Sequence, residues 1–153
     1  MSQPWKRALR LPEGIEILNE RDADQRFRTN DPRMDRYTLR DYLKWNKHSN
    51  EVCFVYKIEG VIAGILEISV SNDFITIEMV GRNVLVQASA VGTKLMSLAE
   101  NIARQLGKKE IRLESLDSVV EWYDEHLGYV EYDQPYNDSE FGRLTPKRKL
   151  MQV

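Results

Sequence analysis

The stretch QASAVGTKLMSLAENIARQLG, residues 87–107, carries the strongest signal for the fold of this chain. From Val91 to Leu106, apolar residues recur at spacings of three and four, the pattern of a helix with one buried face. Gly107 follows at the position where helices commonly end. The sequence therefore predicts one long helix over 91–106, entered through a loop of small residues.

The segments on either side of this helix have the composition of strands. Val52–Ile58, Val61–Val70 and Phe74–Val80 are rich in β-branched and aromatic residues, and only short turn signals separate them. They predict an antiparallel meander. After the helix, Ile111–Ser115 alternates as a strand, so the strand–helix–strand order predicts a right-handed parallel crossover.

The two ends of the chain extend this pattern. Ile15–Leu18 predicts a short first strand, and Arg21–Lys47 predicts one or two short helices. Ser118–His126 opens with capping-box spacing and predicts a further short helix. Tyr129–Tyr132 and Gly142–Leu150 predict a terminal hairpin. We expect one α+β domain over residues 1–153: a three-layer fold with a mixed, mainly antiparallel sheet of six to seven strands and helices on both faces.

Composition and charge exclude several classes of protein. The 153 residues include 22 Lys and Arg, 24 Asp and Glu, one cysteine (Cys53) and two histidines. A disulfide within the chain and a multi-Cys/His zinc site are therefore excluded, and we expect no metal. The net charge of -2 argues against a nucleic-acid partner. No apolar run approaches the roughly 18 residues of a membrane span, so we expect a soluble cytoplasmic protein.

The loop before the long helix is the first candidate site. Small residues let backbone amides approach a ligand closely, and a helix start offers unpaired N–H groups and a positive dipole end. No acidic residue lies between Glu78 and Glu100. This arrangement predicts an anion site, although an ordinary loop packed with small residues would look the same. The candidate residues are Gln87, Ala88, Ser89, Ala90, Val91, Gly92 and Thr93.

The order of these segments resembles the GCN5-related N-acetyltransferase (GNAT) superfamily. That superfamily's signature, Arg/Gln-x-x-Gly-x-Gly/Ala at the start of the long helix, corresponds here to Gln87, Ala90 and Gly92. Its second landmark, an aromatic pair, Glu, Leu-Gly and an aromatic, corresponds to the sequence WYDEHLGY over residues 122–129. The chain departs from the family at Ala90, where glycine is usual, and at Leu116, where asparagine is frequent.

The resemblance implies an enzyme that transfers the acetyl group of acetyl-CoA directly to a primary amine in a ternary complex. It places the pyrophosphate on Gln87–Thr93 and the pantetheine arm on the backbone of Met79, Val80 and Gly81. It also makes Tyr123 the general acid that protonates the leaving thiolate, whereas a packed aromatic is the structural alternative. Members of the family often dimerise, so a homodimer is a further expectation.

A general base would help because a lysine-like amine, with a pKa near about 10.4, attacks only when neutral. Glu78 and Glu67 are carboxylates within apolar strands, where desolvation would raise their pKa. Alternation places Glu78 on one face with Thr76 and Val80. Either carboxylate is a candidate base. The alternatives are Glu114, or bulk water acting on an α-amine. If these strand faces are solvated, the pKa of Glu78 and Glu67 would not be raised by desolvation.

The acceptor has no motif, and we expect a small amine or a peptide amine. Its specificity is expected from Asp22–Lys47 and from a loop over Gln134–Glu140. Basic residues at Lys6–Arg10 and Arg143–Lys149 raise the alternative of a toxin-like transferase that acetylates aminoacyl-tRNA. A non-catalytic acyl-CoA-binding module is the third reading.

Overall fold

The structure is a computed structural model that describes residues 4–116, 123 and 127–151. Its elements, in chain order, are α1 (Pro4–Ala8), β1 (Ile15–Ile17), the 3₁₀ turn η1 (Glu20–Asp22), α2 (Pro32–Asp35), α3 (Leu39–Trp45), β2 (Glu51–Ile58), β3 (Val61–Val70), β4 (Phe74–Arg82), α4 (Val91–Gln105), β5 (Glu110–Leu116), β6 (Val130–Glu131), β7 (Tyr136–Asp138) and β8 (Gly142–Leu150). The predicted long helix is confirmed as α4. The helix predicted over Ser118–His126 lies outside the described residues, apart from Tyr123.

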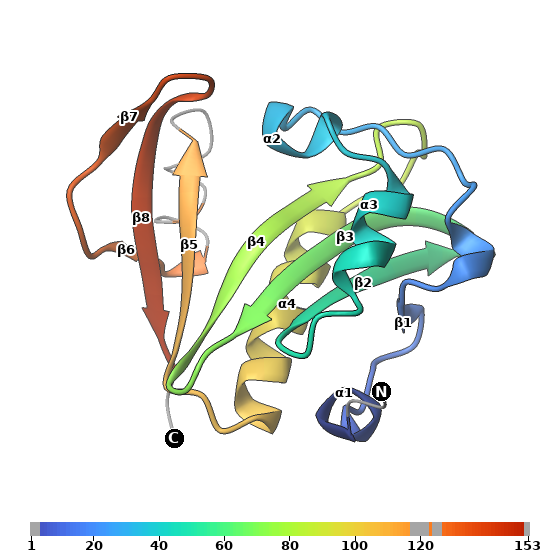
Figure 1. Cartoon of the computed structure of the whole chain (residues 1–153), viewed down its shortest axis with the longest axis horizontal. Coiled ribbons are helices and arrows are strands. Elements are labelled where there is room, and N and C mark those ends of the chain that lie inside the picture. Colours follow the sequence, from blue (N-terminus) through green and yellow to red (C-terminus); the bar gives the residue numbers. More distant parts are fainter. Residues whose placement is uncertain (1–3, 117–122, 124–126, 152–153) are drawn as a thin grey trace.

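The strands form one mixed sheet in the order β1-β2-β3-β4-β5-β8-β6, with β7 also pairing with β8 (Figure 1). Only β4 and β5 run parallel, which confirms the meander and the crossover. The sheet has eight strands rather than the predicted six or seven, because Tyr136–Asp138, within the predicted loop, forms the additional strand β7. Three residues are too short to show periodicity, and the Asp138 carboxylate makes the turn by accepting the N–H groups of Glu140 and Phe141.

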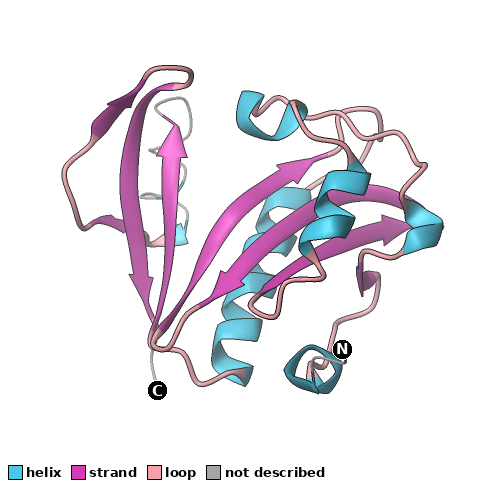
Figure 2. Cartoon of the chain, in the orientation of Figure 1, coloured by secondary structure: helices cyan, strands magenta, loops and turns pink. Residues whose placement is uncertain are grey.

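Helices cover both faces of the sheet, as predicted. Figure 2 shows α3 in front of the strands and α4 behind them. The face under α4 holds the larger core cluster, which includes Leu66, Ile75 and Ile111. The face under α2 and α3 holds a second cluster, which includes Met34, Tyr42 and Ile65. Strands β2 and β3 are therefore buried on both sides, and a charged side chain on either of their faces must find a partner or stay neutral.

The pairing of β4 with β5 ends early. The parallel ladder joins Phe74–Ile77 to Glu110–Leu113 and goes no further, and Figure 1 shows the two strands opening into a V towards α2. A β-bulge lies at the point of divergence, since Glu67 pairs with Met79 while Ile68 pairs with Ile77. A bulge bends the strand that carries it.

The bulge also corrects one expectation. Glu78 is the extra residue, so the alternation reverses after it. Thr76 and Glu78 line the same cavity, whereas Val80 packs against the core on the α4 side. The predicted shared face of Glu78, Thr76 and Val80 is therefore wrong for Val80.

The N-terminal residues add a helix that the sequence did not predict. In α1, Lys6 is buried, and its Nζ donates to the carbonyls of Asn46 (2.8 Å) and His48 (2.9 Å). These bonds attach α1 to the end of α3. In the described part of the chain, no helix is long and apolar enough to cross a membrane.

Candidate functional site

The start of α4 is open to solvent and has no capping side chain. Its N-cap residue Ala90 adopts a left-handed conformation (φ 58°, ψ 25°) without a side-chain cap, and its first turn holds no acidic residue. Gln87, Ser89 and Thr93 are exposed around it. An uncapped helix start of this kind leaves N–H groups free for an anion. The geometry thus fits a phosphate group, and the predicted cradle residues lie together.

The loop that joins β4 to this cradle is fixed by Asn83, a residue that the sequence analysis missed. Its buried amide nitrogen donates to the carbonyls of Arg26 (3.1 Å) and Ile62 (2.9 Å). Its carbonyl accepts the backbone N–H groups of Arg28 (3.3 Å) and Leu85 (3.1 Å). A lone asparagine after a strand gives no pattern, so only the fold shows this role.

A cavity of about 270 Å³ lies where β4 and β5 diverge. It is lined by side chains from α2, β4 and β5 and by one tyrosine that follows β6: Arg33, Phe74, Thr76, Ile77, Glu78, Arg112, Leu113, Glu114 and Tyr132. Two of the lining carboxylates, Glu78 and Glu114, thus stand on different strands. The candidate base Glu78 and the alternative Glu114 both belong to this cavity.

The charges around the cavity do not balance. Arg112 pairs with the Glu110 carboxylate at 3.1 Å, and its guanidinium lies 3.8 Å from the centre of the Phe74 ring. Arg33 is paired with the Asp31 carboxylate. By contrast, Glu78 accepts a hydrogen bond from the Ser69 hydroxyl (2.8 Å), and Glu114 is hydrogen-bonded to the Tyr136 hydroxyl. Glu78 and Glu114 are therefore lining carboxylates whose hydrogen bonds come from hydroxyls, which leave the carboxylate charge uncompensated.

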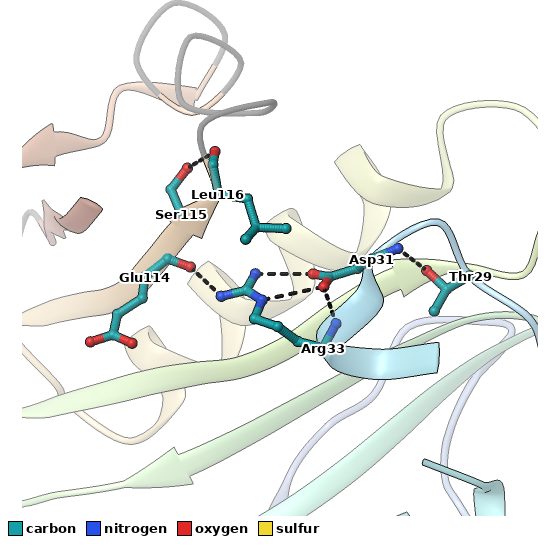
Figure 3. Close-up of polar contacts among 6 residues, drawn as sticks. All are labelled: Thr29, Asp31, Arg33, Glu114, Ser115 and Leu116. Atoms are coloured by element: carbon teal, nitrogen blue, oxygen red, sulfur yellow. Dashed lines mark hydrogen bonds and ion pairs between the residues drawn. The ribbon is translucent and has the colours of Figure 1, made fainter. Parts of the chain in front are cut away.

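Arg33 connects α2 to the edge of this cavity (Figure 3). Its Nη2 and Nε donate to the Asp31 carboxylate at 3.0 and 3.2 Å, and its Nη1 donates to the backbone carbonyl of Glu114 at 2.9 Å. The sequence indicated a turn at Asn30-Asp31-Pro32 but gave no signal that Arg33 would reach β5.

Tyr123 is 6% exposed and belongs to the core cluster on the α4 side. Its ring meets the edge of Tyr129 with centroids 5.9 Å apart, and the Tyr129 N–H donates to the Tyr123 carbonyl at 3.0 Å. Burial raises the pKa of Tyr123 to about 12, against the opposing charge of Arg33. Its hydroxyl therefore keeps its proton at neutral pH and lies within electrostatic reach of Arg33.

Glu67 is 2% exposed, and its cross-strand neighbours are Cys53 and Met79. Its Oε2 accepts no hydrogen bond from the described residues. Burial raises the pKa of Glu67 to about 8, and the carboxylates of Glu51 and Glu78 add to this effect. Glu67 lies on the face of the sheet that holds the second core cluster, and it is not among the residues that line the cavity. It is electrostatically coupled to Glu78, the bulged residue next to its register partner Met79.

The backbone of Met79–Gly81 follows the bulge, along the part of β4 beyond its ladder with β5. Gly81 packs closely there, because a Cβ at this residue would lie 2.7 Å from Met34 Sδ and 3.0 Å from Thr29 Oγ1 and would displace the end of the Met34 side chain. The three residues predicted to bind the pantetheine arm thus border the opening between the strands.

The basic C-terminal segment is not a free surface. Lys147 is buried, and the Lys149 ammonium contacts the Glu100 carboxylate of α4 at 2.9 Å. These positions remove Lys147 and Lys149 from the basic patch that motivated the aminoacyl-tRNA alternative, whereas Arg143 stays exposed. Within residues 4–116, 123 and 127–151, no group of three or more His, Cys, Asp or Glu side chains could hold a metal ion. Cys53 is buried, and burial raises the pKa of its thiol.

Comparison with known proteins agrees with this geometry. The sequence model of the acetyltransferase (GNAT) family matches residues 15–129. No curated protein matches the sequence. Ard1 from Thermoplasma volcanium is 18% identical with a TM-score of 0.72, covering 91% of this chain and 97% of its own. The ribosomal-protein-S18-alanine N-acetyltransferase of Escherichia coli is 16% identical with a TM-score of 0.72, covering 91% and 94%. The PaiA N-acetyltransferase of Thermoplasma acidophilum, solved with coenzyme A, is 16% identical with a TM-score of 0.58, covering 73% and 68%.

Proposed function

Because the chain belongs to the GNAT acetyltransferase family, we propose that it transfers the acetyl group of acetyl-CoA to a primary amine within a ternary complex. The observation that carries the proposal is that the open side of β4 and the open start of α4 follow one another along the chain. A length of β4 that is unpaired on its β5 side leads, through the loop fixed by Asn83, directly to the uncapped start of α4. Strand β4 offers free backbone groups to an extended pantetheine arm, and the start of α4 offers free N–H groups to an anion.

The residues of the chain divide the binding between them. Gln87–Thr93 would hold the pyrophosphate of coenzyme A, and the backbone of Met79–Gly81 would pair with the pantetheine arm. When bound, acetyl-CoA would supply the acetyl group as a thioester whose leaving group is a thiolate. Holding the acceptor amine in the cavity beside this arm would supply much of the acceleration through orientation.

Two side chains would move protons. Tyr123, protonated at neutral pH because burial raises its pKa to about 12, is the proposed donor to the leaving sulfur. Glu78 is the proposed acceptor of the amine proton, because it lines the cavity and its Oε1 is held by Ser69. Glu67 is the weaker candidate base, since it is buried and is not among the residues that line the cavity. Glu114 is better placed to bind the acceptor.

The acceptor should be a cationic amine, because the uncompensated charges of the cavity are those of Glu78 and Glu114. A matched series keeps the chain length and changes only the far end: 1,4-diaminobutane, butylamine and 4-aminobutyrate. We expect kcat/KM, measured by release of free thiol, to be about tenfold higher for the diamine than for butylamine, and lowest for the aminocarboxylate. Raising the salt concentration should narrow the difference.

Glu114→Gln should lower kcat/KM for the diamine about tenfold more than it lowers that for butylamine. Glu131→Gln, which removes one exposed carboxylate from β6 outside the cavity, should leave the ratio of the two substrates unchanged. Equal turnover of all three amines would contradict the charge argument. The lack of turnover with any amine would instead favour the non-catalytic module.

The phosphate cradle can be tested by adding a carboxylate to it. Ser89→Asp should weaken acetyl-CoA binding by roughly a hundredfold in calorimetry, because the new charge repels the pyrophosphate and competes for the free N–H groups of α4. Ser97→Asp adds the same charge at an exposed position two turns along the helix and should weaken binding by less than about threefold. Equal affinities of both variants and the wild type would place the nucleotide elsewhere.

A further inference from the structure

The short segment Thr29–Met34 contacts both of the diverging strands. On the β4 side it packs against Gly81, where a Cβ would lie 2.7 Å from Met34 Sδ and 3.0 Å from Thr29 Oγ1. On the β5 side, Arg33 Nη1 donates to the Glu114 carbonyl at 2.9 Å (Figure 3). One segment therefore spans the opening of the V that Figure 1 shows.

The Glu114 carbonyl needs this donor because the sheet does not supply one. Glu114 and its register partner Pro146 on β8 form a non-hydrogen-bonded pair, because the Pro146 carbonyl accepts the Tyr132 N–H on the opposite side of β8, so the Glu114 carbonyl faces β4. On that side β4 has already diverged, since the ladder ends at Ile77 and Leu113. An unpaired carbonyl in such a place is costly, so the Arg33 guanidinium replaces a missing strand.

The Arg33 side chain is held in one orientation by its neighbours. Its guanidinium is bound by two bonds to Asp31, and the two side chains are 17% and 18% exposed. Asp31 also caps α2 by accepting the Arg33 backbone N–H at 2.8 Å, and its own N–H donates to Thr29 Oγ1 at 3.3 Å. A bidentate pair fixes both the direction and the reach of the side chain.

We propose that Arg33 is a positioning residue that keeps β4 and β5 apart at the spacing the pantetheine arm requires. The inference rests on the proposed function, because it takes the opening between the strands as the site of that arm. Without the guanidinium, the Glu114 carbonyl would gain a partner by approaching the β4 backbone, and the opening would narrow. Binding of the nucleotide half of coenzyme A at α4 would be unaffected.

The test compares two ligands by calorimetry: coenzyme A, and 3′-phospho-ADP, which lacks the pantetheine arm. In the wild type, coenzyme A should bind more tightly than 3′-phospho-ADP. Arg33→Met should reduce this advantage by about tenfold while leaving the affinity for 3′-phospho-ADP within about twofold. Arg33→Lys keeps the charge but not the bidentate fork, so it should lose part of the advantage; it also carries the test if the methionine variant does not fold.

Arg28→Met is the matched control. Arg28 precedes α2 and forms an ion pair, 2.9 Å long, with Asp35 at the end of that helix, and its own side chain is 63% exposed. This control should keep the full advantage of coenzyme A. If the Arg33 variants also keep the full advantage of coenzyme A over 3′-phospho-ADP, Arg33 has no positioning role. If the wild type itself binds neither ligand, the proposed function fails together with this inference.

Discussion

Replacing Tyr123 with phenylalanine is expected to lower kcat for acetyl transfer by about 10²–10³-fold while the affinity for acetyl-CoA changes less than about threefold. The substitution removes only the hydroxyl, and the loss of a positioned proton donor has this magnitude. The ring stays in its packing against Tyr129, so the core is kept. Steady-state release of free thiol measures kcat, and calorimetry with acetyl-CoA measures the affinity.

Tyr129→Phe is the matched control for this experiment. Tyr129 is also buried against the same cluster, and its hydroxyl has no hydrogen-bond partner among the described residues. The loss of the Tyr129 hydroxyl should change kcat by less than about twofold. If Tyr123→Phe behaves like the control, the leaving thiolate does not need this proton, and Tyr123 is a packing residue. If both variants lose activity equally, the effect comes from the core and not from the chemistry.

The second large effect concerns Glu67 and the stability of the fold. In the folded protein burial raises its pKa to about 8, whereas in an unfolded chain a glutamate ionises near about 4.3. The folded state therefore binds a proton that the unfolded state has released, so the free energy of unfolding falls as pH rises through this window. We expect a loss of about 3 to 5 kcal/mol between about pH 5 and pH 9, levelling off above.

Glu67→Gln should remove this slope. The amide stays neutral at all pH values, so the variant should be more stable than the wild type at about pH 9 and similar to it at about pH 5. Urea unfolding at a series of pH values measures the difference between the two proteins. Glu59→Gln, an exposed change in the turn between β2 and β3, should leave the pH dependence unchanged. A wild-type curve parallel to that of Glu67→Gln would mean that Glu67 is ionised in the fold.

Much of the fold could be read from local patterns. The spacing of apolar residues predicted α4 to within one residue at its end, and the composition of the strands predicted the meander and the parallel crossover. The small, uncharged loop before α4 predicted an uncapped helix start, and the structure confirms one at Ala90. These features depend on residues close together in the chain, which is why one sequence can reveal them.

The site depended more on contacts between distant residues. The bulge at Glu78 reversed the expected face of Val80, and it arises from the register of β4 against β3 rather than from any motif. Glu67 and Glu78 looked equivalent as carboxylates in apolar strands, yet only Glu78 lines the cavity. The roles of Arg33 and Asn83 left no signal, because their partners, such as Glu114 and Ile62, are far away in sequence.

The sequence by itself determined the order of the elements, the uncharged helix start and the residue types available for proton transfer. Periodicity and turn chemistry act over a few residues, so they are written in the chain directly. Only the tertiary structure decided which carboxylate is buried, which faces the cavity, and which arginine spans the diverging strands. Burial and hydrogen bonding are set by the elements that pack alongside, and the β4–β5 ladder that ends at Leu113 shows how one such arrangement leaves the Glu114 carbonyl for Arg33 to bind.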